Sequence, residues 1–196
     1  YLYYHRGVTH SLIMLPLWAV LLAVVFAALW RQKPGWRAYA GVAAWGVGIH
    51  IAGDWITSFG TMLVAPFSDA RYALSATFII DLWLTGIILI ALCVCAIWRS
   101  SRMLATIGMA VLAGYVGFQW LLQQQAIEFG QQHAAASAIH NPVVTALPRP
   151  VSPFNWTVLV AEGERYHYAH VNLIRRTVRP AAGEGSGFIE RLDAPY

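Results

Sequence analysis

Four long apolar runs constrain this chain more than any other feature of its sequence. They cover residues 11–30, 38–59, 72–98 and 103–122. Each run reaches about 20 residues, the length that an α-helix needs to cross the hydrocarbon core of a bilayer. Only 11% of the 196 residues are charged, whereas an average soluble domain contains about 25%. The runs therefore predict an all-α polytopic membrane bundle with four transmembrane helices.

The positions of lysine and arginine predict how these helices are oriented. The loops after the first and third runs, "RQKPGWR" and "RSSR", are basic, whereas the second loop offsets Arg71 with Asp69. Cytoplasmic loops carry an excess of Lys and Arg, so we expect the first and third loops inside the cell. The N-terminal stretch, the second loop and everything after residue 122 are then expected on the periplasmic, extracytoplasmic side of a bacterial inner membrane.

A change in composition after residue 122 predicts two domains, 1–122 in the membrane and 123–196 outside it. The second is expected to be a small extracytoplasmic α+β segment that opens with a polar continuation of the fourth helix. A proline-rich stretch, "NPVVTALPRPVSPF", then excludes regular helix, and β-prone runs around Glu162 and Gly163 predict a β-hairpin. Neither chain end carries a clear terminating element, so we interpret the chain as part of a longer protein.

Ionisable residues inside the apolar runs predict a functional site. His50 and Asp54 are four residues apart and share one helical face. An ionisable side chain at the middle of a transmembrane helix costs at least about 2.5–3.5 kcal/mol, and such a residue marks a functional site by default. In the four-helix topology, five groups are expected to converge near the outer interface: His5, His10, His50, Asp54 and Asp81.

Histidines and carboxylates in one place favour a divalent metal, zinc before manganese or iron. A metal there would generate hydroxide from water near neutral pH. His50 and Asp54 are therefore catalytic candidates as well as ligands, together with Arg6. Arg6 and Arg71 flank the same face and are candidates for binding an anionic substrate group such as phosphate. The alternatives are a structural His–Asp network and arginines that anchor at lipid headgroups.

Three segments resemble one family: "HRGVTHS", "HIAGDWITSFGTMLVAPFS" and "IID" with a threonine four residues on. Together they resemble the bacterial inner-membrane metal-dependent hydrolases, also labelled LexA-binding and inner-membrane-associated, over residues 4–85. The resemblance implies a zinc-type hydrolase distantly similar to zinc-dependent phospholipase C and P1 nuclease. It marks His5, His10, His50 and Asp54 as metal ligands or their neighbours, with Asp81 a further candidate. Members of that family usually begin with a further Thr-His segment and a Pro-Asp-x-Asp segment, and neither occurs before "HRGVTHS" in this sequence.

The sequence therefore predicts a membrane-bound metal-dependent hydrolase that acts on a phosphoester, either a lipid, a lipid-linked group or a small molecule. The first alternative is a non-enzymatic binding or regulatory membrane protein with a structural His–Asp cluster. The second is an ion transporter, which the sequence disfavours because the polar groups cluster at one end and the first and fourth runs offer no polar stripe through the bilayer. The net charge of +4 comes mainly from basic residues at helix ends and in the C-terminal third, so we expect no nucleic-acid partner.

Overall fold

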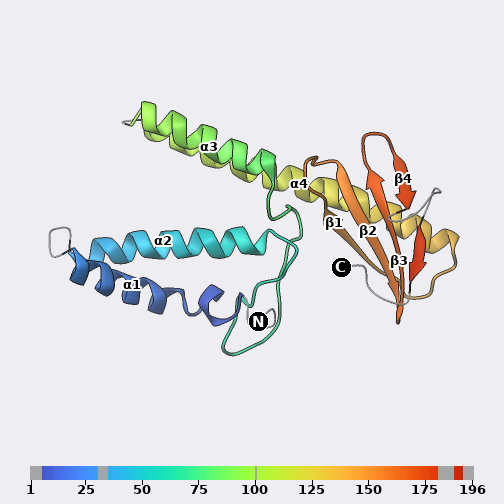
Figure 1. Cartoon of the computed structure of the whole chain (residues 1–196), viewed down its shortest axis with the longest axis horizontal. Helices are drawn as coiled ribbons and strands as arrows, with labels where there is room; N and C mark the ends of the chain where they lie inside the picture. The colour runs from blue at the N-terminus through green and yellow to red at the C-terminus, as the bar shows by residue number, and fades with distance from the viewer. Residues whose placement is uncertain (1–5, 31–34, 100, 181–187, 192–196) are drawn as a thin grey trace. The chain divides into compact units, whose positions relative to one another are not determined.

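The protein divides into two compact units, residues 1–74 and residues 75–196. The structure is a computed structural model that describes residues 6–30, 35–99, 101–180 and 188–191. In Figure 1 the first unit is coloured blue to cyan, and the second green to red.

The first unit is a helical hairpin followed by an irregular segment. A short 3-10 helix, η1 (Val8–His10), leads into α1 (Leu15–Leu29), and α2 (Trp36–Trp55) runs beside α1 (Figure 1). In the segment after α2, Thr61 and Tyr72 form an isolated antiparallel bridge with backbone hydrogen bonds of 2.9 and 3.0 Å. This bridge folds the segment back on itself before the second unit begins.

The second unit begins with two helices that lie side by side, α3 (Leu82–Ile97) and α4 (Arg102–Ala136). Side chains fix where both helices start. The Asp81 carboxylate accepts hydrogen bonds from the backbone N–H groups of the second and third residues of α3, and the Ser101 hydroxyl accepts one from the third residue of α4. Such N-caps satisfy donors that the helix itself leaves unpaired. Asp81 therefore ends the preceding loop and does not lie inside a helix.

An antiparallel sheet follows α4 (Figure 1). Its strands pair in the order β1-β2-β3-β4, and β5 pairs with the part of β3 that β4 leaves uncovered. The β2–β3 hairpin has a two-residue loop that begins with Gly163 at φ +60, a conformation typical of tight hairpin turns. The strands are β1 (Val143–Pro148), β2 (Asn155–Glu162), β3 (Arg165–Asn172), β4 (Thr177–Pro180) and β5 (Ile189–Arg191).

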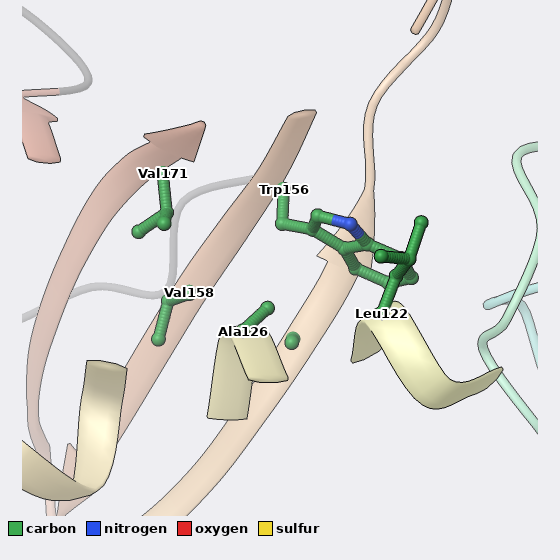
Figure 2. Close-up of a cluster of buried hydrophobic side chains, with 6 residues drawn as sticks. Leu122, Ala126, Trp156, Val158 and Val171 are labelled. Carbon is green, nitrogen blue, oxygen red and sulfur yellow. The ribbon is translucent and has the colours of Figure 1, made fainter. Parts of the chain in front are cut away.

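The hydrophobic core of the second unit lies between the sheet and the C-terminal half of α4. Figure 2 shows Trp156, Val158 and Val171 from the sheet against Leu122 and Ala126 from the helix. Trp156, Val158 and Ala126 are fully buried. Alternate residues of β2 point into this core, as expected of an antiparallel sheet with one covered face. The helix and the sheet therefore form one folded unit.

The prediction of an all-α bundle with four transmembrane helices is wrong. Among the described residues, α4 alone is long and apolar enough to cross a membrane. With 15 and 16 residues, α1 and α3 are about 23 Å long at 1.5 Å per residue, short of the roughly 30 Å hydrocarbon core. The 20-residue helix α2 has sufficient length but insufficient hydropathy, because it contains charged, imidazole and glycine residues.

The C-terminal predictions fare better. The fourth helix continues past residue 122 to Ala136, and the predicted boundary between domains 1–122 and 123–196 falls inside it. The β-hairpin around Glu162 and Gly163 is confirmed. The proline-rich stretch contains no helix, as expected, but it does contain β1. The second unit is thus mixed α and β, and the described part of the chain is not a helical bundle.

Candidate metal centre

His10, His50 and Asp54 meet in the first unit. His50 and Asp54 lie one turn apart on α2, and η1 brings His10 to them across 40 residues of sequence. The two Nε2 atoms are 3.1 Å apart. Asp54 Oδ2 lies 3.3 Å from Nε2 of His10 and 3.7 Å from Nε2 of His50. Three groups that ligate metals in proteins therefore present one atom each to a common point.

Backbone and hydroxyl contacts hold the N-terminal segment in place. The fully buried Ser11 donates from its hydroxyl to the carbonyl oxygens of Leu63 and Ala65, at 3.1 and 2.6 Å. The backbone N–H of Leu12 donates to the Leu63 carbonyl oxygen, and the backbone N–H of Met62 donates to the Arg6 carbonyl oxygen. The residues just before α1 are thus tied to the segment after α2, which places His10 beside the last turn of α2.

Arg6 supports the carboxylate from the side opposite the histidines. Its Nη2 lies 3.3 Å from Asp54 Oδ1, and its Nη1 donates to Thr57 Oγ1 at 2.8 Å. The Thr57 hydroxyl in turn donates to the Asp54 carbonyl at 2.8 Å, and the guanidinium lies over the Phe59 ring. Only 10% of the Arg6 side chain and 14% of the Asp54 side chain are exposed. Arg6 therefore acts as a positioning residue that directs Oδ2 toward the imidazoles.

The cluster is closed on one side and open on another. His10 is mostly buried, with 18% of its side chain exposed, whereas 63% of the His50 side chain is exposed. The Thr9 hydroxyl lies 2.8 Å from Nδ1 of His10 and so fixes the orientation of that ring. Catalytic zinc sites combine three protein ligands with one open position. The exposure of His50 leaves room for a water molecule or a substrate atom.

The donor atoms fit a tetrahedral metal ion. At ligand distances of about 2.0–2.2 Å, two nitrogen or oxygen ligands of such an ion stand about 3.3–3.6 Å apart. The three distances here, 3.1, 3.3 and 3.7 Å, lie close to that range. Asp54 Oδ2 is buried and has no hydrogen-bond partner among the described residues, although buried carboxylate oxygens are normally satisfied. A cation between the three groups would satisfy it.

The other predicted site residues lie elsewhere or outside the described part. His5 precedes the first described residue. Asp81 belongs to the second unit, where its carboxylate caps α3 and accepts hydrogen bonds of 3.0 and 2.9 Å from the Tyr115 hydroxyl. Arg71 is exposed and donates from Nη1 to the Gly60 carbonyl oxygen at 3.3 Å. The structure thus brings three of the five predicted ligands together.

Sequence reasoning missed the polar residues of α4. Tyr115, Gln119 and Gln123 recur every four residues, and the two glutamines are buried. Gln119 approaches Asp81 Oδ2, while Gln123 donates to the Ser75 and Ala146 carbonyl oxygens at 3.1 and 3.2 Å. Tyr115 and Gln119 lie in the C-terminal half of the fourth run and Gln123 lies just beyond it, so the expectation that this run has no polar stripe through the bilayer stays a prediction. The four-residue spacing of these side chains is the sequence signal that could have identified them.

The described residues contain one helix that is long and apolar enough to cross a membrane, a His–Asp cluster at a helical hairpin, and an antiparallel sheet, a combination that fits the class of membrane proteins. Only 6% of the most apolar stretch of α4 is buried within the protein, so this helix is not an ordinary core helix. Residues 1–126 match the model of the YdjM inner membrane protein family. The match spans more than half of the chain, and the chain belongs to this family.

The family match supports the predicted location in the inner membrane. The matched residues include η1, α1, α2 and the whole His10–His50–Asp54 cluster. The match ends within α4, before the sheet begins. The family description names a location and no reaction. No curated protein and no solved structure matches the chain.

Proposed function

We propose that the first unit holds a divalent metal ion, zinc first, and that the protein is a membrane-bound metal-dependent hydrolase of phosphoesters. The observation that carries this proposal is the triangle of His10 Nε2, His50 Nε2 and Asp54 Oδ2, with sides of 3.1, 3.3 and 3.7 Å. Imidazole and carboxylate ligands without thiolate are typical of catalytic metal sites.

Each residue of the cluster has a distinct role in this proposal. His10 and Asp54 form the buried part of the ligand set, and His50 completes it at the exposed side. Arg6 orients Asp54 through the contact with Oδ1. A bound zinc ion would supply a hydroxide nucleophile near neutral pH and polarise the phosphoryl oxygen. Arg71, exposed in the same unit, is the candidate for binding the anionic group of the substrate.

Inner-membrane location favours a lipid or lipid-linked phosphoester as substrate. A membrane protein meets such molecules at high local concentration, whereas soluble phosphoesters must diffuse to it. We propose further that the sheet lies on the periplasmic side. Arg99 and Arg102 stand at the N-terminal end of α4, and the positive end of a spanning helix is normally cytoplasmic. An alkaline phosphatase reporter fused after Ala136 should be active, and activity of a cytoplasmic reporter there would reverse the orientation.

The metal is tested first. The full chain is purified in detergent without chelating resin, and its zinc, manganese and iron are quantified by mass spectrometry. We expect about one ion per chain, and its loss in His50→Ala. Because the His50 side chain is mostly exposed, this variant should fold. The control is His140→Ala, which removes an exposed histidine of the second unit. Wild-type protein without stoichiometric metal would overturn the proposal.

Hydrolysis is tested second, on the metal-loaded protein. Chromogenic phosphodiesters and phosphomonoesters, and then radiolabelled phospholipids in mixed micelles, are offered to wild type, His50→Ala and His140→Ala. We expect turnover by wild type and His140→Ala only. Metal without turnover of any of these substrates would leave a metal-binding membrane protein and exclude phosphoester hydrolysis.

A further inference from the structure

The sheet of the second unit has a polar face on the side away from α4. Residues of β2, β3 and β4 that alternate with the core residues point to this face. The strand register places Asn155 opposite Asn172, and Asn172 opposite Thr177. Two residues further along each strand, a second row on the same face consists of Thr157, His170 and Arg179. Two rows of hydrogen-bonding side chains therefore cross three strands.

This polar face is hollowed into a pocket of about 510 Å³. Arg149, which follows β1, and Arg175, from the β3–β4 loop, join Arg179 in its lining. Three arginines thus surround one concave site. Among the described residues, no carboxylate lies within ion-pair distance of any of the three guanidinium groups.

The neutral side chains of the pocket hold its shape. Asn172 Nδ2 donates to Asn155 Oδ1 at 2.6 Å, and the backbone N–H of Arg175 donates to Asn172 Oδ1 at 2.8 Å. These bonds tie the β3–β4 loop to β2. Arg149 is fixed to β2 by its backbone N–H, which donates to the Asn155 carbonyl at 3.0 Å. Arg149 and Arg175 therefore project from anchored backbone, which lowers the cost of ordering the pocket when a ligand binds.

Three like charges around one pocket repel each other, and an anion in the pocket would turn this repulsion into attraction. The planar guanidinium offers several donors in a fork that matches the oxygens of a phosphate group. The volume of about 510 Å³ is within the range of organic ligand pockets, about 300–1,000 Å³, and exceeds what one inorganic phosphate ion fills. The chemistry and the size together favour an organic molecule that carries phosphate.

We propose that the Arg149–Arg175–Arg179 pocket binds the phosphate group of an organic phosphate ester, which is either a soluble metabolite or a lipid headgroup. The residues of this pocket are different from those of the metal centre, and they lie in the other unit and beyond the residues of the family match. His170 lines the same pocket, and its Nδ1 lies 3.1 Å from the Thr157 hydroxyl. This histidine adds a neutral donor or acceptor to the three cations.

The test measures binding to the full chain in a non-ionic detergent by titration calorimetry. The soluble probe is glycerol 3-phosphate, and the lipid probe is dihexanoyl phosphatidic acid, with dihexanoyl phosphatidylcholine and glycerol as ligands without a phosphomonoester. EDTA is present so that a metal in the first unit does not contribute. We expect binding of at least one phosphomonoester probe and none of glycerol. A clear preference for glycerol 3-phosphate identifies a soluble ester, and a clear preference for the lipid probe identifies a headgroup. Equal affinities show that the pocket recognises the phosphate group alone.

Point variants locate the site. Arg149→Gln and Arg179→Gln keep a polar side chain, shorter than that of arginine, and remove the charge. Each should weaken binding about tenfold or more, because charge-assisted hydrogen bonds are among the stronger ones. The matched control is Arg165→Gln, at the exposed β2–β3 turn outside the pocket. His50→Ala should bind as wild type, which separates this site from the metal centre. The proposal is overturned if wild type binds neither probe, or if Arg149→Gln and Arg165→Gln bind equally.

Discussion

Arg6 of the first unit and the three pocket arginines of the second unit differ in burial and in charge pairing. In the first unit, the Arg6 guanidinium is buried and paired with Asp54 and Thr57. In the second, the exposed guanidinium groups of Arg149, Arg175 and Arg179 surround a pocket without a carboxylate partner among the described residues. Buried charges in proteins are nearly always paired, whereas exposed charges are stabilised by water. The first arrangement therefore contributes to the fold, and the second is available to a ligand.

The largest effect should come from breaking the buried pair. Arg6→Met leaves the Asp54 carboxylate without its cation, and Asp54→Leu leaves the guanidinium without its anion. Removal of one partner of a buried pair costs about 3–5 kcal/mol, whereas apolar replacement of both is often tolerated. We expect each single variant to lower the free energy of unfolding by that amount in detergent micelles. The double variant should cost less than the sum, and an additive result would show that the two residues do not interact.

The next largest loss of stability is expected from a substitution where α4 packs against the covered face of the sheet. A Cβ atom at Gly130 of α4 would lie 2.5 Å from Val144 Cγ1 and 2.8 Å from Val158 Cγ1, so the valine side chains or the backbone of the helix or sheet must shift to admit it. Overpacking of a core costs about 1–3 kcal/mol. Gly130→Ala should therefore destabilise the second unit, as measured by denaturant titration. Gly114→Ala, where a Cβ meets open space, is the control and should be neutral or slightly stabilising, since alanine favours helix.

Local sequence signals predicted local structure well. The four-residue spacing of His50 and Asp54 placed both on one helical face, and the turn at Gly163 predicted the β2–β3 hairpin. The apolar runs overestimated the lengths of α1 and α3, because an apolar run does not distinguish a helix from an apolar loop. Asp81 directly before an apolar run is an N-cap signal, and it marks the true start of α3.

The sites depended on contacts that no local pattern contains. His10 reaches α2 because Ser11 and Arg6 bond to residues 62–65, and only a tertiary fold makes those contacts. The arginine pocket arises from the register of three strands and the loop between β3 and β4. Arg149 follows β1, a strand that the sequence did not predict because prolines surround it. Proline is tolerated at the ends of edge strands, and Pro148 closes this one.

Removal of charges from the arginine pocket should have little effect on the free energy of unfolding. Arg149→Gln and Arg179→Gln alter exposed side chains without a paired carboxylate, and surface substitutions of this kind change the free energy of unfolding by no more than about 0.5 kcal/mol. We expect both variants to unfold at the same denaturant concentration as wild type. A loss of several kcal/mol would mean that these arginines are structural, and the contrast with Arg6 would disappear.

The smallest effect concerns proton binding by His170. Partial burial, with a further contribution from the positive charge of Arg149, lowers the pKa of His170 below its usual value of 6.5. The Thr157 hydroxyl from β2 and Arg179 from β4 are the other polar groups beside it. The folded protein therefore binds fewer protons at this site than the unfolded chain, so stability from this group is present above pH 6.5 and falls as the pH drops through that value.

His170→Gln removes this proton-binding site and keeps a polar side chain. We expect the fall in unfolding free energy between pH 7.5 and pH 5.5 to be smaller in His170→Gln than in wild type, and unchanged in the control His140→Ala. A phosphate ester in the pocket should oppose the effect, because an anion stabilises the protonated imidazole. With saturating glycerol 3-phosphate the difference between wild type and His170→Gln should shrink. If it does not, His170 and the arginines do not share one ligand.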